Sequence, residues 1–369
     1  MRIFLYLCLS LLVPLAMSGR SLVVGLNAAY QKIITLPTLV PSSVNRASAA
    51  VDAVGGKGQN VVLASSCIGV QPLLAQFLGG TEGGAVEAML RRVSPACSEF
   101  TVSTAAKTRT CITLIDERSK EATEIIEPSG AISGPESLTL LSRLRDAFAE
   151  EKAGAITIMG SAPPGIAEKY YGDIVRACGG PGTKVVIDSL YGVGDVIDAS
   201  AAAGADLCVK VNARELLKLV DYRPAAGVSE KETERAIDGA SILAAAALLG
   251  NKCPSGAEVF VCLTDGPFSA YLLPVASRAG RAAAGYSRYS LPPLPRALVN
   301  PIGAGDSVAA GLSAAWAGAI ALPRADLEAA FRFGLACGMA SCLTTVNAML
   351  DEGEARALFE SIEVETLLL

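Results

Sequence analysis

The sequence predicts an α/β protein with a mostly parallel central sheet flanked by helices, and two patterns support this prediction. From about residue 153 onward, strand-like apolar runs alternate with stretches of helix formers; the runs cover residues 155–159, 184–188, 206–212 and 258–263. Such alternation implies right-handed crossovers and a parallel sheet covered on both faces. The second pattern consists of short alternating segments within about 32–54 and 100–128. These segments predict a small sheet that stands apart from the main one.

The first 20 residues differ from the rest of the chain. A basic start at Arg2 precedes an apolar run over residues 3–17, and small residues at positions 16 and 18 fit cleavage after Ser18. These features are typical of a secretory signal peptide. We therefore expect residues 1–20 to be a signal or targeting segment for the secretory or an organellar route, and residues 21–369 to form one domain. Without such a segment the expected location is the cytoplasm. No other stretch predicts a membrane span.

The predicted elements follow in order along the domain. Residues 21–27 form a buried strand, and residues 55–60 form a glycine-rich turn that enters a helix over 61–68. A second glycine-rich turn at 78–84 leads into another helix, and strands follow at 107–116 and 121–127. The later strands end at Asp188, Asn212 and Asp265. Because ligands of parallel sheets bind beyond the carboxyl ends of the strands, we expect a site there.

Composition excludes several classes of function. The net charge of −5 gives no nucleic-acid footprint. The chain contains no histidine, which excludes Ser-His-Asp and Cys-His catalysis and histidine-ligated zinc. Its ten cysteines form no C-x-x-C pair, so we expect small core residues rather than a disulfide framework or a cysteine metal site.

The turn Asn300-Pro301-Ile302-Gly303-Ala304-Gly305-Asp306 precedes a stretch of helix formers. Free amides and partial positive charge at a helix start favour an anion, and glycines allow close approach. A carboxylate there can take a proton from an attacking hydroxyl, which fits phosphoryl transfer. The alternative is a loop with glycines in which Asp306 only caps the helix.

The turn Gly55-Gly56-Lys57-Gly58-Gln59-Asn60 also allows backbone to approach a ligand. It does not match the P-loop pattern, and the glycines alone are weak evidence for a dinucleotide site. The alternative is a plain tight turn with a solvated Lys57.

Four motifs in this order resemble those of the ribokinase/PfkB carbohydrate kinase family. They are Gly55-Gly56-Lys57-Gly58-x-Asn60, Gly160-Ser161-x-Pro163-Pro164-Gly165, Lys210-x-Asn212-x-x-Glu215 and Gly303-Ala304-Gly305-Asp306. The resemblance runs from Leu22 to about Asn347 and is closest to the branch that phosphorylates sugar phosphates. It implies a ribokinase-like three-layer sandwich with a small β-sheet lid, which in many relatives also forms a homodimer.

The resemblance also implies the catalytic parts. ATP would donate its γ-phosphoryl group, Asp306 would be the general base, and the turn from Gly303 through Ala304 and Gly305 would form the anion hole. Asn212 would contact the triphosphate, and Glu215 would help to hold Mg²⁺ indirectly. A monovalent cation assists some relatives. Nucleotide-binding positions would be Lys210, Asn212, Thr264, Asp265, Gly266, Gly305 and Asn347. For Lys210 the alternative is a solvated lysine at a strand end.

For the acceptor, the resemblance implies that Gly56 and Asn60 hold sugar hydroxyls, while Lys57 and Arg109 pair with the substrate's phosphate. A guanidinium suits bidentate phosphate contacts; the alternative is that Arg109 is a surface residue of the lid. Relatives of this branch usually carry Asp where this chain has Gln31, and often Asn where it has Ile126. Gln31 would still hydrogen-bond the sugar, but as a neutral group.

Three functional hypotheses follow. The leading one is ATP-dependent phosphorylation of fructose-1-phosphate, fructose-6-phosphate or tagatose-6-phosphate. The second is a kinase of a free sugar or nucleoside, against which Lys57 and Arg109 argue. The third is a non-catalytic sugar- or nucleotide-binding protein on the same fold. Gln31 and the signal-like segment motivate it, whereas Asp306, Asn212 and Glu215 argue for an enzyme.

Overall fold

The computed structural model describes residues 20–119, 121–221, 239–279 and 285–368, and these parts form a central sheet of ten strands with a second sheet of four. The main sheet has the order β14-β13-β12-β11-β10-β9-β8-β1-β4-β5. Its parallel strands are β1 (Ser21–Val24), β4 (Leu73–Leu78), β5 (Phe100–Ser103), β8 (Ala155–Met159), β9 (Lys184–Asp188), β10 (Asp206–Asn212) and β11 (Glu258–Thr264).

Three antiparallel strands, which the sequence analysis did not predict, extend this sheet beyond β11. They are β12 (Ala270–Ala276), β13 (Gly285–Ser290) and β14 (Glu363–Leu368). The last strand comes from the end of the chain and pairs with β13 over its whole length. The predicted mostly parallel sheet is therefore confirmed, with an antiparallel edge.

Helices cover both faces of the main sheet. One face carries α3 (Gly134–Ala147), α4 (Tyr170–Cys178), α5 (Val193–Ala203), α6 (Ala213–Leu219) and α8 (Gly239–Gly250); the other carries α1 (Lys57–Cys67), α2 (Gly80–Val93), the 3₁₀ helix η1 (Pro95–Ser98), α9 (Ala304–Trp316), α10 (Leu327–Ser341) and α11 (Glu352–Ser361). Alternate strand residues supply the two cores: Leu207 and Val209 face the first group, and Cys208 faces the second. This arrangement confirms the predicted three-layer sandwich.

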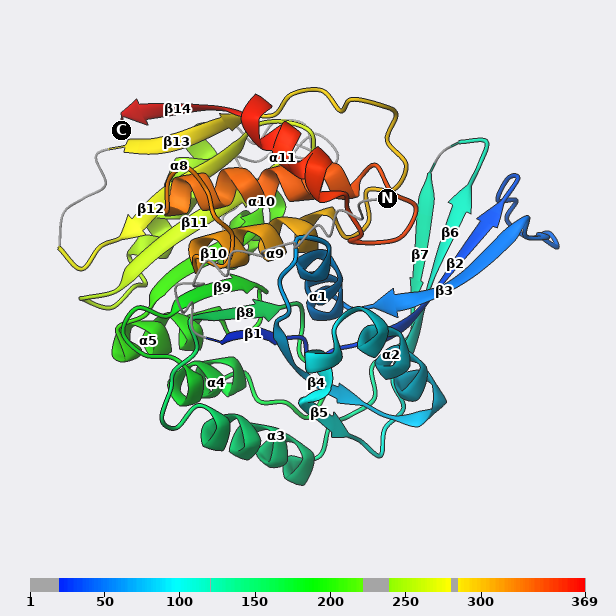
Figure 1. Cartoon of the computed structure of the whole chain (residues 1–369), viewed down its shortest axis with the longest axis horizontal. Coiled ribbons are helices and arrows are strands. Elements are labelled where there is room, and N and C mark those ends of the chain that lie inside the picture. Colours follow the sequence, from blue (N-terminus) through cyan, green and yellow to red (C-terminus); the bar gives the residue numbers. More distant parts are fainter. Residues whose placement is uncertain (1–19, 120, 222–238, 280–284, 369) are drawn as a thin grey trace, which may run out of the picture.

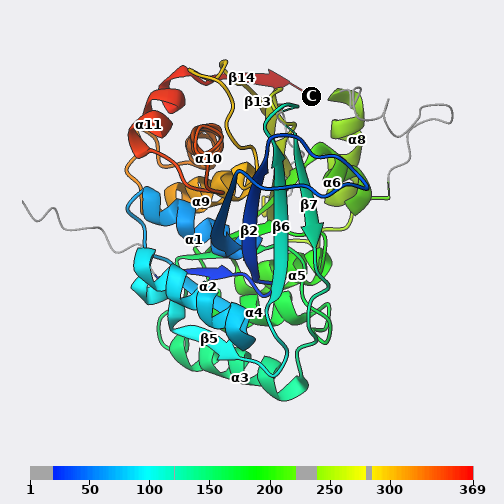
Figure 2. The ribbon, with the colours of Figure 1, turned by 90° about the vertical axis from the view of Figure 1, so that its right-hand side faces the viewer.

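The four-stranded sheet, called the lid below, projects from the body of the molecule (Figure 1) and presents its strands upright in the second view (Figure 2). Its order is β3-β2-β6-β7, with β2 (Ala29–Leu36), β3 (Ala49–Gly55), β6 (Arg109–Asp116) and β7 (Ala122–Ile126). The predicted range 100–128 was too wide at its start. Residues 100–103 are β5 of the main sheet, because Phe100 and Val102 are buried in the main core.

The predicted targeting segment lies almost entirely outside the described residues, which begin at Arg20. Within the parts of the chain that the structure describes, no helix combines the length and apolar character that a membrane crossing requires. The cysteines of these parts are all unpaired, and most are buried, as expected for small core residues.

Candidate active site

A cavity of about 630 Å³ lies where the strands β9, β10 and β11 end and where the lid meets the body. We call it the polar cavity. It is lined by residues of all four sequence motifs, with Gly160 and Ser161 from the second one. The predicted site residues that line it are Gln31, Gly56, Lys57, Asn60, Arg109, Lys210, Asn212, Glu215, Thr264, Gly303, Gly305, Asp306 and Asn347. The structure thus brings together side chains that are far apart in the sequence.

A second cavity, of about 660 Å³, lies next to it and is lined largely by apolar groups. We call it the apolar cavity. Its walls come from the turn after β11, the segment before α9, and helices α9 and α10. They include Leu291, Leu294, Leu298, Val308, Leu335 and Met339. Thr264 and Gly305 line both cavities. The start of α9 therefore forms the boundary between a polar and an apolar compartment.

The turn before α9 is fixed by its own backbone. Gly303 has φ 84°, and a Cβ on it would lie 2.7 Å from the backbone nitrogen of Ala348, so only glycine fits without a shift. The Ser307 amide donates to the Gly303 carbonyl at 2.9 Å, and the Ala304 amide donates to the Pro301 carbonyl at 3.3 Å. The amides of Gly305 and Asp306 precede the first helical hydrogen bond and have no intrahelical acceptor. They can bind an anion, whereas the Ala304 amide is partly engaged in the turn.

Asp306 lies in the first turn of α9 but does not cap it, because the N-cap is Gly303 and the helix has no side-chain cap. Its side chain is buried, and its Oδ2 accepts a hydrogen bond of 2.8 Å from Nδ2 of Asn60. Burial and the charge of Asp188 raise the pKa of Asp306 to about 6, against the opposing effects of Asn60 and two lysines. A carboxyl group with this pKa is ionised near neutral pH and is more basic than an exposed aspartate.

Asp188, at the end of β9, joins two lysines from separate motifs. Its Oδ1 lies 2.6 Å from Nζ of Lys57, and its Oδ2 lies 2.5 Å from Nζ of Lys210. Burial alone would raise the pKa of Asp188, but the charges of Lys210 and Lys57 outweigh it and hold that pKa below its usual value. The alternative of a solvated lysine is therefore wrong for Lys210, which is buried. Lys57 is paired with Asp188, but its side chain remains 42% exposed.

Lys210 also lies against the start of α9. Its Nζ would be 3.0 Å from a Cβ placed on Gly305. An ammonium beside free helix amides adds positive charge where an anion would bind. This position agrees with the predicted contact between Lys210 and nucleotide phosphates.

Asn212 and Glu215 form a capping box at the start of α6. Oδ1 of Asn212 accepts from the Glu215 amide at 2.9 Å, and Oε2 of Glu215 accepts from the Asn212 amide at 2.9 Å. The other oxygen, Oε1, faces Lys57 at 3.7 Å within the polar cavity. Across the described residues no three potential ligands cluster as a metal site. A single carboxylate, that of Glu215, fits a Mg²⁺ ion held mainly by phosphates, because Mg²⁺ keeps several bound waters and needs few carboxylate ligands.

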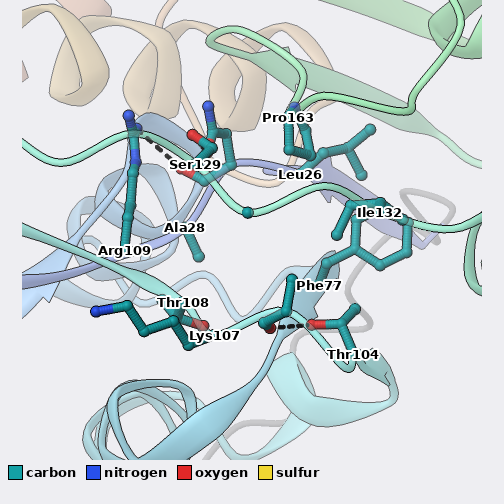
Figure 3. A pocket seen from close by; sticks show the side chains of 13 residues that line it. Leu26, Ala28, Phe77, Thr104, Lys107, Thr108, Arg109, Ser129, Ile132 and Pro163 are labelled. Atoms are coloured by element: carbon teal, nitrogen blue, oxygen red, sulfur yellow. Dashed lines mark hydrogen bonds between the residues drawn. The ribbon is translucent and has the colours of Figure 1, made fainter.

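Arg109 stands at the first position of β6, at the base of the lid, rather than on the lid surface. It lines the polar cavity and also a small cavity of about 20 Å³ (Figure 3), in which it lies beside Ser129 and opposite Leu26 and Ile132. Its Nη2 donates to the Asn27 carbonyl at 3.3 Å, and its Nε is buried without a partner among the described residues. The side chain of Asn27 in turn donates to Oγ of Ser161 at 3.1 Å.

The remaining acceptor-side residues come from the first motif and the lid. Gly56 has φ 105°, and a Cβ on it would lie 2.3 Å from Oε1 of Gln59, so the turn requires glycine. Oδ1 of Asn60 is buried with no partner in the described part of the chain, which leaves it able to accept a hydrogen bond from a ligand hydroxyl. Gln31 is buried on β2, where its Nε2 donates to Oγ1 of Thr113 at 2.7 Å.

The predicted nucleotide-binding residues fall into two groups. Thr264, Asp265 and Gly266 follow one another at the end of β11 and line the apolar cavity. Asn347, by contrast, lines the polar cavity, where its Oδ1 accepts from Nδ2 of Asn300 at 2.9 Å. Its interaction with Asn300, which the sequence analysis overlooked, anchors the turn before α9. These two asparagines are 47 positions apart, and no sequence motif connects them.

The fold agrees with that of solved carbohydrate kinases. The chain resembles phosphofructokinase-2 from Escherichia coli in complex with fructose-6-phosphate, with 22% identity, 93% of this chain and 99% of that chain covered, and a TM-score of 0.71. It also resembles the tetrameric inhibited form of that enzyme (23% identity, 93% and 99% covered, TM-score 0.70). Ribokinase from Arabidopsis thaliana in complex with ribose and ATP is similar at 16% identity, with 93% and 99% covered and a TM-score of 0.61.

The family is identified from a match along the sequence. The family model of the pfkB carbohydrate kinases matches residues 21–348, which is most of the chain and contains both cavities. The chain therefore belongs to the pfkB family of carbohydrate kinases, which transfer a phosphoryl group from ATP with Mg²⁺ to an alcohol.

Proposed function

We propose that this protein phosphorylates a hydroxyl of a sugar phosphate with ATP. One observation carries the proposal: Asp306, oriented by Asn60, stands at the boundary between a polar cavity with cationic groups and an apolar cavity. The apolar cavity suits a nucleobase, and the polar cavity suits a phosphorylated acceptor. The γ-phosphoryl group would lie between them, at the start of α9.

In this mechanism Asp306 takes the proton of the acceptor hydroxyl as its oxygen bonds to the γ-phosphorus. The bond from that phosphorus to the β,γ-bridging oxygen breaks, and ADP leaves. The amides of Gly305 and Asp306, together with Lys210, stabilise the charge on the transferred group. Mg²⁺, when bound to the triphosphate near Glu215, would neutralise phosphate charge.

The acceptor's own phosphate would be bound near the base of the lid. Arg109 supplies a guanidinium there whose Nε has no partner within the described ranges of the chain, and Ser161 adds a hydroxyl from the loop after β8. Lys57 would contribute charge while it remains paired with Asp188. A guanidinium beside a hydroxyl binds a phosphate group of the acceptor more strongly than it binds a neutral sugar hydroxyl.

The test is ATP consumption by the purified full-length chain with Mg²⁺, with and without K⁺, against free sugars, nucleosides and hexose phosphates. We expect turnover with a hexose phosphate such as fructose-1-phosphate, fructose-6-phosphate or tagatose-6-phosphate. K⁺ is included because one solved structure of phosphofructokinase-2 holds potassium. Turnover only with free sugars or nucleosides would favour the second hypothesis. ATP binding without any turnover would favour a non-catalytic binding protein.

The rate should depend on pH through Asp306. Its pKa is raised to about 6, and only the ionised carboxylate can accept the hydroxyl proton. Above pH 6 the base is ionised, so kcat is expected to be level; below pH 6 it should fall about tenfold for each pH unit. A profile of kcat between pH 4.5 and 8, measured at saturating substrates, checks this. A rate that stays level down to pH 5 would contradict the assignment of Asp306.

We also propose that the lid forms a homodimer. The edge strand β3 exposes Val51 (49%), and the loop before it exposes Val44 (82%); phosphofructokinase-2 from Escherichia coli is known in a tetrameric form. A charge inside an apolar interface is costly, so Val51→Asp is expected to convert a dimer to a monomer in sedimentation experiments. Leu368→Asp on β14 is the control and should leave the dimer intact. A wild-type chain that sediments as a monomer at every concentration would refute the dimer.

A further inference from the structure

One row of lid residues in the wall of the polar cavity carries no charged group, although Arg109 and Glu124 of the same sheet also line the cavity. Strand register places Gln31 of β2 opposite Cys111 of β6, and Cys111 opposite Ile126 of β7. These three residues share one face of the lid, and all of them line the polar cavity. The row consists of one amide, one thiol and one aliphatic side chain.

The amide of Gln31 is held in one orientation. Its Nε2 donates to Oγ1 of Thr113, two residues further along β6 than Cys111, at 2.7 Å. Its Oε1 lies on the side of Gly55, where a Cβ would be 3.0 Å away. Gly55 also lines the polar cavity. Gln31 therefore offers the ligand a neutral carbonyl oxygen, which accepts a hydrogen bond but carries no charge and donates none.

The other two members of the row offer little to a hydroxyl group. Ile126 is 56% exposed although it lines a cavity with many polar groups. Burial raises the pKa of the Cys111 thiol, which keeps it neutral. A ligand hydroxyl placed against these two side chains would lose water without gaining a strong partner, whereas a methylene or methyl group would gain contact. The next row again ends in a polar group, Glu124.

We propose that the acceptor is a phosphorylated deoxy sugar. One of its hydroxyls donates to Oε1 of Gln31, and a carbon without oxygen packs against Cys111 and Ile126. Thr113 acts as a positioning residue that keeps the Gln31 carbonyl toward the ligand. This inference rests on the proposed function, because it specifies the acceptor of the same site.

The test compares ligands in pairs on the full-length chain. Binding of fructose-6-phosphate, tagatose-6-phosphate, their 1- and 3-deoxy derivatives and the single 4-deoxy derivative that these C4 epimers share is measured by calorimetry, and turnover is measured with ATP and Mg²⁺. At least one deoxy derivative is expected to bind about tenfold more tightly than its parent and to be phosphorylated with the higher kcat/KM. If every parent binds more tightly than all its deoxy derivatives, the inference is wrong while the proposed function stands.

Two variants connect the preference to the lid. Ile126→Asn is expected to reverse the ratio of the two affinities, deoxy derivative over parent sugar phosphate, in favour of the parent. The new amide can form a hydrogen bond with the hydroxyl that the deoxy derivative lacks. Ile125→Asn is the matched control: it places the same change on the other face of β7 and should leave the ratio unchanged. Equal ratios in wild type and Ile126→Asn would overturn the inference.

Gln31→Met keeps the size of the side chain and removes its hydrogen bond. Affinity is expected to fall about tenfold for every ligand that carries the hydroxyl read by Gln31, and to stay constant for the derivative that lacks it. A uniform loss across all ligands would contradict the role of Gln31. Tighter binding of a deoxy derivative with no phosphorylation of any ligand in the panel, parent sugars included, would support the preference for the deoxy carbon and refute the proposed kinase activity, so the two failures are distinguishable.

Discussion

Asp306→Asn is expected to reduce kcat by about 10³- to 10⁴-fold while leaving ATP and sugar-phosphate binding nearly unchanged. The amide has almost the shape of the carboxylate, so Asn60 and the turn before α9 keep their positions. It cannot accept the proton of the attacking hydroxyl, and general-base catalysis contributes about 10²- to 10⁴-fold. Single-turnover rates and calorimetric binding on the same preparation separate the two effects.

Asp146→Asn is the control for this variant. Asp146 is an exposed residue near the end of α3, remote from both cavities, and the change should alter kcat by less than twofold. A residual rate in Asp306→Asn within tenfold of wild type would show that another group takes the proton. A loss of binding equal to the loss of rate would assign Asp306 to positioning instead.

Asp188→Asn is expected to lower the free energy of unfolding by about 3 kcal/mol and to raise the KM for ATP. The substitution removes the charge that lies between Lys57 and Lys210 and leaves the buried Lys210 ammonium without its counter-ion. Removal of one partner of a buried ion pair costs about 3–5 kcal/mol, because the other charge remains desolvated. Urea unfolding followed by circular dichroism measures the stability, and steady-state kinetics measures KM.

The chain offers a matched control for this change. Asp173 on α4 also lies between two cations, with Lys169 at 3.1 Å and Arg176 at 3.0 Å, but both cations are exposed. Surface ion pairs contribute about 0–1 kcal/mol, so Asp173→Asn should have little effect. Equal losses of stability in the two variants would mean that burial of the pair with Lys210 has no energetic consequence.

Much of the fold could be predicted because its signals are local. The runs at 155–159, 184–188 and 206–212 are short, apolar and followed by helix formers, and each is a parallel strand in the structure. The antiparallel edge could not be predicted in this way. Its last strand, Glu363–Leu368, is exposed along much of its length, so no buried-strand pattern marks it.

The candidate site was predictable as a set of residues but not as a set of contacts. Sequence motifs predict that Lys57 and Lys210 lie near phosphates, yet Asp188, which joins them, belongs to no motif and is marked only by its position at a strand end. The sequence predicts a nucleotide contact for Asn347, which lines the polar cavity, but it does not predict the hydrogen bond between Asn347 and Asn300. The hydrogen-bond partner of a side chain, and the cavity that it lines, depend on how distant segments pack together. Residue spacing along the sequence does not give the distances between such segments.

The bond between Asn60 and Asp306 joins residues 246 positions apart, on helices from opposite ends of the domain. Long-range contacts form late in folding, because closing a long chain segment costs entropy before the contact stabilises it. Asp306 can gain its partner only after the chain has been synthesised beyond the start of α9, so a polypeptide that stops before residue 306 cannot carry a finished site.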